Sequence, residues 1–329
     1  MTARAPNVKD LDVIPLEKIE EARMNLEHQG VLKTPLVPLN IDLDDKKIYL
    51  KLENLQPIGS FKIRGALNAI KCTPPVFLSN GVYTASAGNF AQGLAWGATK
   101  LGIPAKIVVP ENAPQMKVDS IQRYGGEVIR VPYDDWWGTM MSHTYPGLEG
   151  EFVHPVCDPN VIAGNGTAGL EILEDLPDVD AIIAPFGGGG LLCGIASVMK
   201  SKKPSTKIYA CEVETAAPLS ASLAAKQPWT CDYEKTFIDG MGAKCVLPGM
   251  WNLISNLVDD SIVLSVEEIA DAIRLLVTRH HMIAEGAGAA PLAAALSGKA
   301  GSGNIVCVIS GGNIDNAKLI SILQGHIPN

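Results

Sequence analysis

The chain has 329 residues, of which 47% are hydrophobic and 19% are charged, and this balance excludes a disordered or fibrous protein. The formal net charge is −8, so we expect no nucleic acid as a partner. Seven cysteines lie scattered without a CxxC pair, which argues against a disulfide framework and a zinc site and indicates a reducing, cytoplasmic compartment. No apolar run approaches the roughly 18 residues of a membrane span, so we expect no membrane contact.

Short β-branched runs alternate with longer segments of helical spacing, which predicts an α/β fold of open, twisted, mostly parallel sheets flanked by helices. In chain order, the first series comprises helix 60–72, strand 82–85, helix 89–101, strand 105–109, helix 115–124, strand 127–131 and helix 135–143. A second series contains strands near 181–185, 207–212 and 304–309.

These two series predict two domains. We assign residues 1–79 plus 154–329 to a large domain and residues 80–153 to a small domain that is inserted into it. The N-terminal segment includes a predicted strand at 47–53, which we expect to pair with the C-terminal sheet. No Gly/Ser-rich or Pro-rich linker marks the boundary, and the sequence contains no internal repeat.

A run of four glycines follows the predicted strand 181–185 and opens a helix; it comprises Gly187, Gly188, Gly189 and Gly190. Backbone N–H groups without Cβ atoms around them can converge on one anion at a helix N-terminus, and this pattern predicts a phosphate site. The dinucleotide fingerprint G-x-G-x-x-G fails here, because Leu192 or Cys193 stands at the third glycine position. Glu212 ends a strand about twenty residues on, as a ribose-binding acid does, so NAD is the less favoured alternative.

The segment GSFKIRGA places Lys62 between Phe61 and Ile63 at a predicted helix start. Apolar neighbours on both sides favour a partly desolvated amine, and burial lowers the pKa of a lysine toward its neutral, nucleophilic form. Such a lysine can form a Schiff base. Most helical lysines are solvated surface charges, so this segment alone does not separate the two interpretations.

Two more polar segments follow predicted strands. In TASAGNFAQG, Ser86, Gly88 and Asn89 offer a hydroxyl, an accessible backbone and an amide at a helix N-terminus, which suits a carboxylate. In SGGNIDNAKL, Ser310 follows an apolar strand, and the strand-end rule for parallel sheets places it at the same crevice as the glycine run. An ordinary helix cap is the alternative for both segments.

In this order, GSFKIRGA, SAGN, GGGG and SGGN resemble the fold type II pyridoxal-phosphate enzymes, specifically the serine/threonine dehydratase and serine racemase family. The resemblance extends from about residue 15 to 325. It includes VIAGNGT at 161–167, DGMGAK at 239–244 and AEGAGAA at 284–290. It implies pyridoxal 5′-phosphate as cofactor, a small domain inserted in a large one, and a homodimer.

The resemblance also implies roles for individual residues. Lys62 would hold the cofactor as a Schiff base, and the four glycines with Leu191 would bind its phosphate through backbone N–H groups. Asn89 would reach the ring hydroxyl, Phe61 would pack beside the ring, and Ser310 would bond to the pyridine nitrogen. A neutral serine does not enforce pyridine protonation, so β-elimination is favoured over a long-lived carbanion.

The implied reaction converts a 3-hydroxy amino acid, namely L-threonine, L-serine or an aryl analogue such as phenylserine, to a 2-oxo acid and ammonia. The small-molecule substrate would contact Ser86, Ala87, Gly88, Asn89 and Phe90. Racemases of the family carry a second serine at the position of Ala87 as an acid/base, so alanine favours elimination. A serine-type racemase and a non-catalytic cofactor-binding relative are the alternatives.

Three departures from the family pattern concern the metal and the substrate. Members with a divalent-cation site use a glutamate matching Glu212 and an acidic residue six positions later, where this chain has Pro218. We therefore expect a divalent cation at Glu212 only if backbone oxygens complete the site. The loop histidine is replaced by Phe90, and a basic group near Gly138 is absent. Trp136 and Trp137 stand beside that position, which predicts either core packing or an apolar pocket for a bulky side chain.

Overall fold

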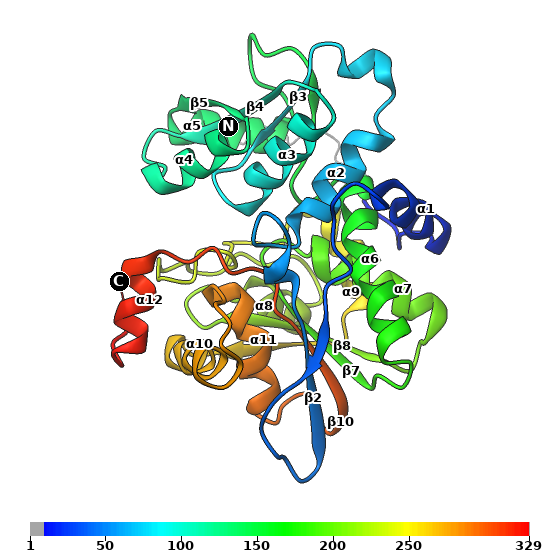
Figure 1. The fold of residues 1–329 in the computed structure, drawn as a ribbon, viewed down its shortest axis with the longest axis vertical. Coiled ribbons are helices and arrows are strands. Elements are labelled where there is room, and N and C mark those ends of the chain that lie inside the picture. Colours follow the sequence, from blue (N-terminus) through cyan, green and yellow to red (C-terminus); the bar gives the residue numbers. More distant parts are fainter. Residues whose placement is uncertain (1–9, 329) are drawn as a thin grey trace.

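The computed structural model describes residues 10–328; residues 1–9 and 329, at the two ends of the predicted large domain, lie outside this range. The described chain forms two sheets that lie one above the other in Figure 1, with α2 and α6 between them. No helix in this part of the chain is long and apolar enough to cross a membrane. The prediction of an α/β fold with two mostly parallel sheets is confirmed.

The larger sheet has six strands within residues 10–328. Their order is β1 (Leu36–Pro38), β2 (Lys46–Lys51), β10 (Gly303–Val308), β7 (Ala181–Pro185), β8 (Lys207–Val213) and β9 (Asp260–Leu264). Only β1 is antiparallel to its neighbour. The predicted pairing of the N-terminal strand with the C-terminal sheet is confirmed, because β2 runs parallel to β10 with Ile48 opposite Ile305.

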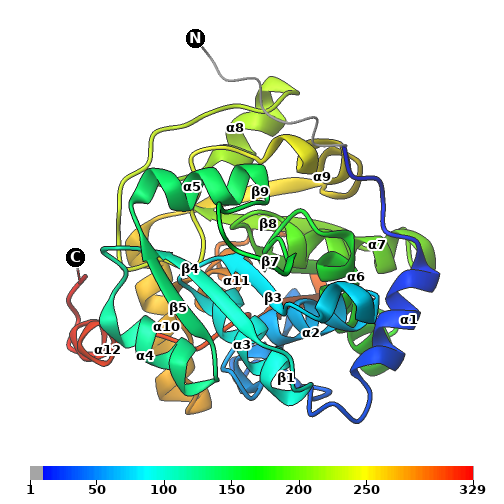
Figure 2. The ribbon, with the colours of Figure 1, turned by 90° about the horizontal axis from the view of Figure 1, so that it is seen from above.

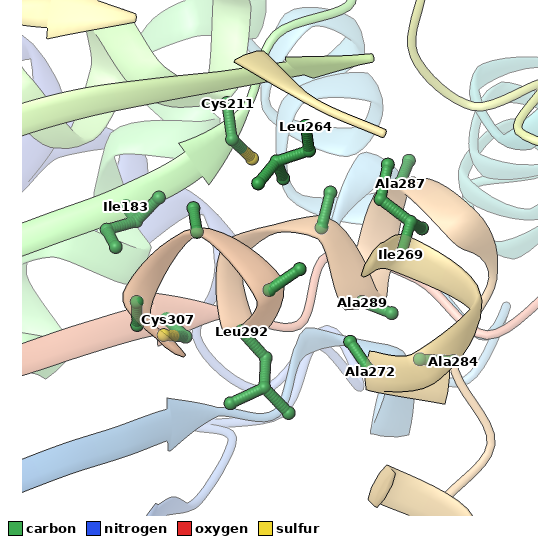
Figure 3. Packing of buried hydrophobic residues seen from close by; sticks show 14 of the residues in the cluster. Ile183, Cys211, Leu264, Ile269, Ala272, Ala284, Ala287, Ala289, Leu292 and Cys307 are labelled. Atoms are coloured by element: carbon green, nitrogen blue, oxygen red, sulfur yellow. The ribbon is translucent and has the colours of Figure 1, made fainter. Parts of the chain in front are cut away.

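Helices cover both faces of this sheet, because the side chains of its central strands are buried on both sides. In β10, Ile305 and Cys307 face one core while Val306 and Val308 face the other. The first core lies under α10 (Val266–His280), α11 (Gly286–Leu296) and α12 (Asn316–Leu323). Figure 3 shows the alanines of α11 against this face of the sheet. The second core lies under α1 (Leu16–Leu26), α6 (Pro159–Asp175), α7 (Gly190–Lys202) and α9 (Trp251–Leu257).

The smaller sheet is formed wholly by residues between 82 and 152 among those described. Its order is β5 (Glu127–Val131), β4 (Ala105–Pro110), β3 (Val82–Ala85) and β6 (Glu151–Phe152), all parallel. Helices α2 (Lys62–Cys72), α3 (Asn89–Lys100) and α4 (Gln115–Arg123) pack on one face, and α5 (Tyr133–Ser142) packs on the other. Figure 2 shows α5 and α3 on opposite sides of β4. That 80–153 is a domain in its own right stays a prediction.

Several element boundaries differ from the predicted ones by one or two residues, and short elements were not predicted. The unpredicted elements include β1, β6, β9, helix α8 (Pro218–Ala225) and the 3-10 helices η1 (Glu53–Leu55), η2 (Pro75–Leu78) and η3 (Pro248–Met250). Helix α2 begins at Lys62 and not at residue 60, because the two preceding residues pair with the chain beyond β10. The Phe61 N–H donates to the Ser310 carbonyl at 3.0 Å, and Ser60 forms a bridge with Gly311.

Candidate active site

A cavity of about 330 Å³ lies where the chain leaves the carboxyl ends of β3, β7 and β10. This is the position at which parallel α/β sheets bind ligands. Its walls include all the residues predicted for cofactor and substrate, namely Phe61, Lys62, Ser86, Ala87, Gly88, Asn89, Phe90, Gly187, Gly188, Gly189, Gly190, Leu191 and Ser310. The structure therefore brings together four segments that lie up to about 250 residues apart in the sequence.

Lys62 is the first residue of α2, and its amine faces this cavity. The ammonium nitrogen lies 3.4 Å from the Pro155 carbonyl oxygen, 5.0 Å from the centre of the Phe61 ring and 5.7 Å from that of Phe90. Burial lowers the pKa of Lys62 to about 8, although the Glu285 carboxylate opposes the change. A substantial neutral fraction near pH 8 makes this amine a competent nucleophile and base.

A buried ionic network fixes the helix that carries Lys62. Arg64, two residues after Lys62 on α2, is 1% exposed and donates to both oxygens of Glu53 at 2.8 Å and to Glu171 at 2.7 and 2.8 Å. Lys51 also donates to Glu171, at 2.6 Å. Two cations and two carboxylates thus join β2, η1, α2 and α6. Buried charges are tolerated when they are paired and hydrogen-bonded in this way.

The glycine run leads from β7 into α7, with Gly189 as the N-cap and Gly190 as the first helical residue. Gly189 has φ +94°, a left-handed conformation that disfavours a side chain. A Cβ on Gly188 would lie 2.7 Å from the Val156 side chain, and one on Gly187 would lie 3.3 Å from the Gly240 carbonyl oxygen. The absence of Cβ atoms therefore lets the chain pass close to these neighbours. The N-terminus of α7, a helix of 13 residues, faces the cavity and favours an anion there.

Asn89 opens α3 and connects both parts of the site. Its Nδ2 donates to Glu285 Oε1 at 2.9 Å, and its Oδ1 accepts from Asn313 Nδ2 at 2.8 Å. Asn313 in turn donates to the Ile58 carbonyl at 2.9 Å. These bonds fix the orientation of the Asn89 amide and leave one of its N–H groups free for a ligand.

Glu285, Asp239 and Lys117 are cavity residues that the sequence analysis did not assign. Burial, followed by the charge of Asp239, raises the pKa of Glu285 to about 7, while Lys117, Asn89 and Lys62 act in the opposite direction. Lys117 pairs with Asp239 at 2.8 Å. Asp239 and Glu285 belong to DGMGAK and AEGAGAA, so their segments were recognised although the carboxylates were not. A lone carboxylate directly before an alanine-rich helix was the available signal for Glu285.

Two predicted residues lie away from the cavity lining. Trp137 is 40% exposed, so it belongs neither to the core nor to this pocket, the two alternatives given for it, whereas its neighbour Trp136 lines the cavity. Glu212 lies on β8 and caps α8: its two oxygens accept from Leu219 N at 2.8 Å and Ser220 N at 2.7 Å. Across residues 10–328, no group of three or more His, Cys, Asp or Glu side chains is arranged for a metal ion. The divalent-cation hypothesis gains no support.

The residues present fit pyridoxal phosphate. The cavity offers a buried amine with a lowered pKa at Lys62, a helix N-terminus with a side-chain-free cradle at residues 187–190, and the nearly buried hydroxyl-bearing residue Ser310. The amine suits the aldehyde, the cradle suits the phosphate, and the hydroxyl suits the ring nitrogen.

Comparison with known proteins agrees with this geometry. The model of the family described as "Pyridoxal-phosphate dependent enzyme" matches residues 28–311. The chain is similar to the L-threonine ammonia-lyase of Geobacter sulfurreducens, with 44% identity over 84% of this chain and 69% of that protein. It is similar to the catabolic L-threonine dehydratase TdcB of Staphylococcus aureus, with 36% identity over 98% of this chain and 96% of that protein.

A solved structure of maize serine racemase superposes with a TM-score of 0.84 at 33% identity, covering 97% of this chain and 98% of that chain. The predictions of a fold type II architecture and of a pyridoxal-phosphate-dependent lyase are confirmed. The chain belongs to the pyridoxal-phosphate-dependent enzymes of fold type II, in the family of the serine/threonine dehydratases and serine racemases.

Proposed function

We propose that this enzyme is an ammonia-lyase that converts L-threonine, and less readily other 3-hydroxy amino acids, to a 2-oxo acid and ammonia by β-elimination. The observation that carries the proposal is the amine of Lys62, which has a lowered pKa and lines the same cavity as the glycine run and the loop 86–89. The names of the relatives in Geobacter sulfurreducens and Staphylococcus aureus support the same reaction.

Lys62 is the residue that holds the cofactor and then moves the proton. Pyridoxal phosphate, when bound, supplies the electron sink that stabilises charge at the substrate α-carbon. The free Lys62 amine would take the substrate α-proton, for which a pKa of about 8 is suitable. The Pro155 carbonyl oxygen, 3.4 Å from Nζ, orients the free amine.

The other cofactor contacts follow from the cavity walls. Residues 187–190 with Leu191 bind the phosphate through N–H groups at the start of α7. The second N–H of Asn89 would be available to the ring hydroxyl, and Phe61 would pack beside the ring. Ser310 bonds to the pyridine nitrogen without protonating it, which favours departure of the β-hydroxyl over a persistent carbanion.

The loop before α3 is the proposed substrate site. Ser86, Gly88 and Asn89 stand at the N-terminus of a 12-residue helix, where a carboxylate is favoured. Phe90 and Trp136 give the wall an apolar character. Such a wall suits the methyl group of threonine, and it is also compatible with an aryl substrate such as phenylserine. Lys117 also lines the cavity, and its charge is paired with that of Asp239.

Elimination rather than racemisation is favoured by Ala87, which lines the cavity but carries no proton to exchange. A racemase needs a second acid/base on the opposite face of the substrate α-carbon from Lys62. The similarity to maize serine racemase makes racemisation the second candidate. A non-catalytic relative is disfavoured because Lys62 is present and faces the cavity.

We further propose a cytoplasmic homodimer. All seven cysteines lie in the described range and are free thiols, which supports a reducing compartment. The homodimer is what the family resemblance implies. Light scattering of the purified protein tests the dimer directly: a mass near 70 kDa, about twice that of one chain of 34.9 kDa, is expected, and a mass of one chain contradicts it.

The reaction is tested by incubating the cofactor-loaded enzyme with the L- and D-isomers of threonine, serine, phenylserine and 3-hydroxyaspartate, and measuring 2-oxo acid, ammonia and the enantiomer of the remaining substrate. The proposal expects 2-oxo acid and ammonia in equal amounts, with L-threonine preferred over 3-hydroxyaspartate. Formation of the opposite enantiomer without 2-oxo acid identifies a racemase and overturns the proposal.

A further inference from the structure

The turn at residues 155–157 forms one wall of the cavity and contacts both groups proposed to hold the cofactor. The Pro155 carbonyl accepts from Lys62 Nζ at 3.4 Å. The Val156 side chain lies against the glycine run, since a Cβ on Gly188 would lie 2.7 Å from it. The Val156 carbonyl oxygen lies 3.5 Å from a Cβ placed on Gly190. A shift of this turn therefore disturbs the lysine and the phosphate cradle together.

His154 is the residue that shapes this turn. Its Nδ1 accepts two backbone hydrogen bonds, from Val156 N at 3.0 Å and from Cys157 N at 2.8 Å. The imidazole is 5% exposed and packs against the rings of His143 and Phe152, whose centroids lie 4.8 and 6.1 Å away. One ring nitrogen thus satisfies the N–H groups of two successive residues that the turn would otherwise leave without a partner.

The imidazole can accept hydrogen bonds at Nδ1 only while this nitrogen carries no proton, and the surroundings of the ring disfavour its protonation. Burial, followed by the charges of His143 and Lys62, lowers the pKa of His154 to about 3, against one hydrogen bond with the Met140 backbone. With Nδ1 accepting, the single ring proton lies on Nε2. His154 is therefore a fixed acceptor at neutral pH and not a proton donor to the substrate.

We propose that His154 is a positioning residue for cofactor binding: by accepting from the Val156 and Cys157 N–H groups, it holds the 155–157 turn against Lys62 and the glycine run. It does not line the cavity, so it acts only through the turn. The inference rests on the proposal that Lys62 and residues 187–190 bind pyridoxal phosphate. It does not depend on which amino acid the enzyme uses.

The test compares three substitutions at His154 by titrating the cofactor-free protein with pyridoxal phosphate and following the absorbance of the lysine-bound form. In His154→Asn, the side-chain oxygen is attached to Cγ as Nδ1 is, so the acceptor stays in place. In His154→Gln, the acceptor lies one bond farther out. His154→Leu has a similar size and no acceptor.

We expect His154→Asn to bind the cofactor within about threefold of the unmodified protein, and His154→Gln and His154→Leu to bind it at least about tenfold more weakly. The Asn and Gln variants share an amide, so their comparison remains decisive if the Leu variant does not fold. Equal affinities of these two variants overturn the inference, as does an unchanged affinity of the Leu variant.

His143→Asn is the matched control. It removes the neighbouring imidazole, and asparagine tolerates the left-handed backbone of residue 143, where φ is +62°. No side-chain bond from His143 to the 155–157 turn is present, so this variant is expected to keep its cofactor affinity. If the unmodified protein does not bind pyridoxal phosphate at Lys62, the proposed cofactor site is wrong. If the unmodified protein binds it there and the His154 variants bind it with the same affinity, the role of His154 is wrong.

Discussion

Asn89 Nδ2 donates a 2.9 Å hydrogen bond to Glu285 Oε1, and this bond joins the first residue of α3 to the residue that precedes α11. It connects the smaller sheet to the larger one across the mouth of the cavity. Glu285 is only 6% exposed. Burial, followed by the charge of Asp239, raises the pKa of this carboxyl to about 7, so its protonation changes in the working range of most enzymes.

Replacing Glu285 by glutamine is expected to stabilise the protein increasingly as the pH rises. The pKa of Glu285 is about 7 in the folded state and about 4.3 for an unperturbed glutamate. The folded state therefore binds this proton more tightly, and the resulting stability is complete below about pH 4 and is lost as the pH rises through 7. The advantage of Glu285→Gln in unfolding free energy is expected to grow by roughly 2–3 kcal/mol between pH 5 and pH 8.

Urea unfolding at the two pH values measures this difference. Glu267→Gln, the same substitution at an exposed position on α10, controls for the substitution itself. An advantage of Glu285→Gln that is the same at pH 5 and pH 8 contradicts a raised pKa for Glu285.

Removing the guanidinium of Arg64 is expected to be strongly destabilising. Arg64→Met leaves the buried carboxylates of Glu53 and Glu171 with fewer partners, and the loss of one member of a buried ion pair typically costs about 3–5 kcal/mol. Lys33→Met is the matched control, because Lys33 is half exposed and pairs with Glu174 and Asp175 at the surface, where such pairs contribute about 0–1 kcal/mol. Equal losses in the two variants would show that the network contributes little to stability.

A methyl group on the glycine run is expected to weaken cofactor binding. In Gly188→Ala, the new Cβ lies 2.7 Å from Val156, so either the run or the 155–157 turn has to move. We expect at least about a tenfold loss of affinity for pyridoxal phosphate, measured by absorbance titration. Gly138→Ala, where a Cβ meets no atom within 4 Å, is expected to bind normally. Normal binding by Gly188→Ala contradicts the tight cradle.

Adding a hydroxyl at residue 87 is expected to introduce racemisation. Ala87→Ser places an exchangeable proton on the cavity wall, and a positioned acid/base contributes typically about 10²–10⁴ in rate. Chiral chromatography of L-serine incubated with the variant should detect D-serine, while the unmodified enzyme forms 2-oxo acid with little D-serine. Comparable racemisation by the unmodified enzyme is the outcome that contradicts the role given to Ala87.

Much of the sheet framework was predictable from the sequence, because short runs rich in β-branched residues alternate with segments of helical spacing. Strands 82–85, 127–131 and 181–185 were predicted with the bounds that the structure shows. Strands β1 and β6 have three and two residues, too few for a periodic signal, and they are defined only by the strand with which each pairs.

The site was predictable where its residues follow strands and mark a local turn, as at Asn89, the glycine run and Ser310. Lys117, Asp239 and Glu285 were not predictable in this way, because their placement depends on two sheets meeting. Likewise, adjacent tryptophans on one helix point in different directions, so Trp136 reaches the cavity while Trp137 lies at the surface. Helical spacing alone did not tell which of the two faces inward.

The central claim is that Lys62 carries the cofactor, and reduction with borohydride followed by peptide mapping tests it most directly. The purified enzyme loaded with pyridoxal phosphate should absorb visible light from its imine and lose this absorbance on reduction. The account predicts that the reduced cofactor is attached to the peptide containing Lys62, and that Lys62→Ala shows neither the absorbance nor the label. Attachment to a different lysine, or an undiminished label in Lys62→Ala, would contradict it.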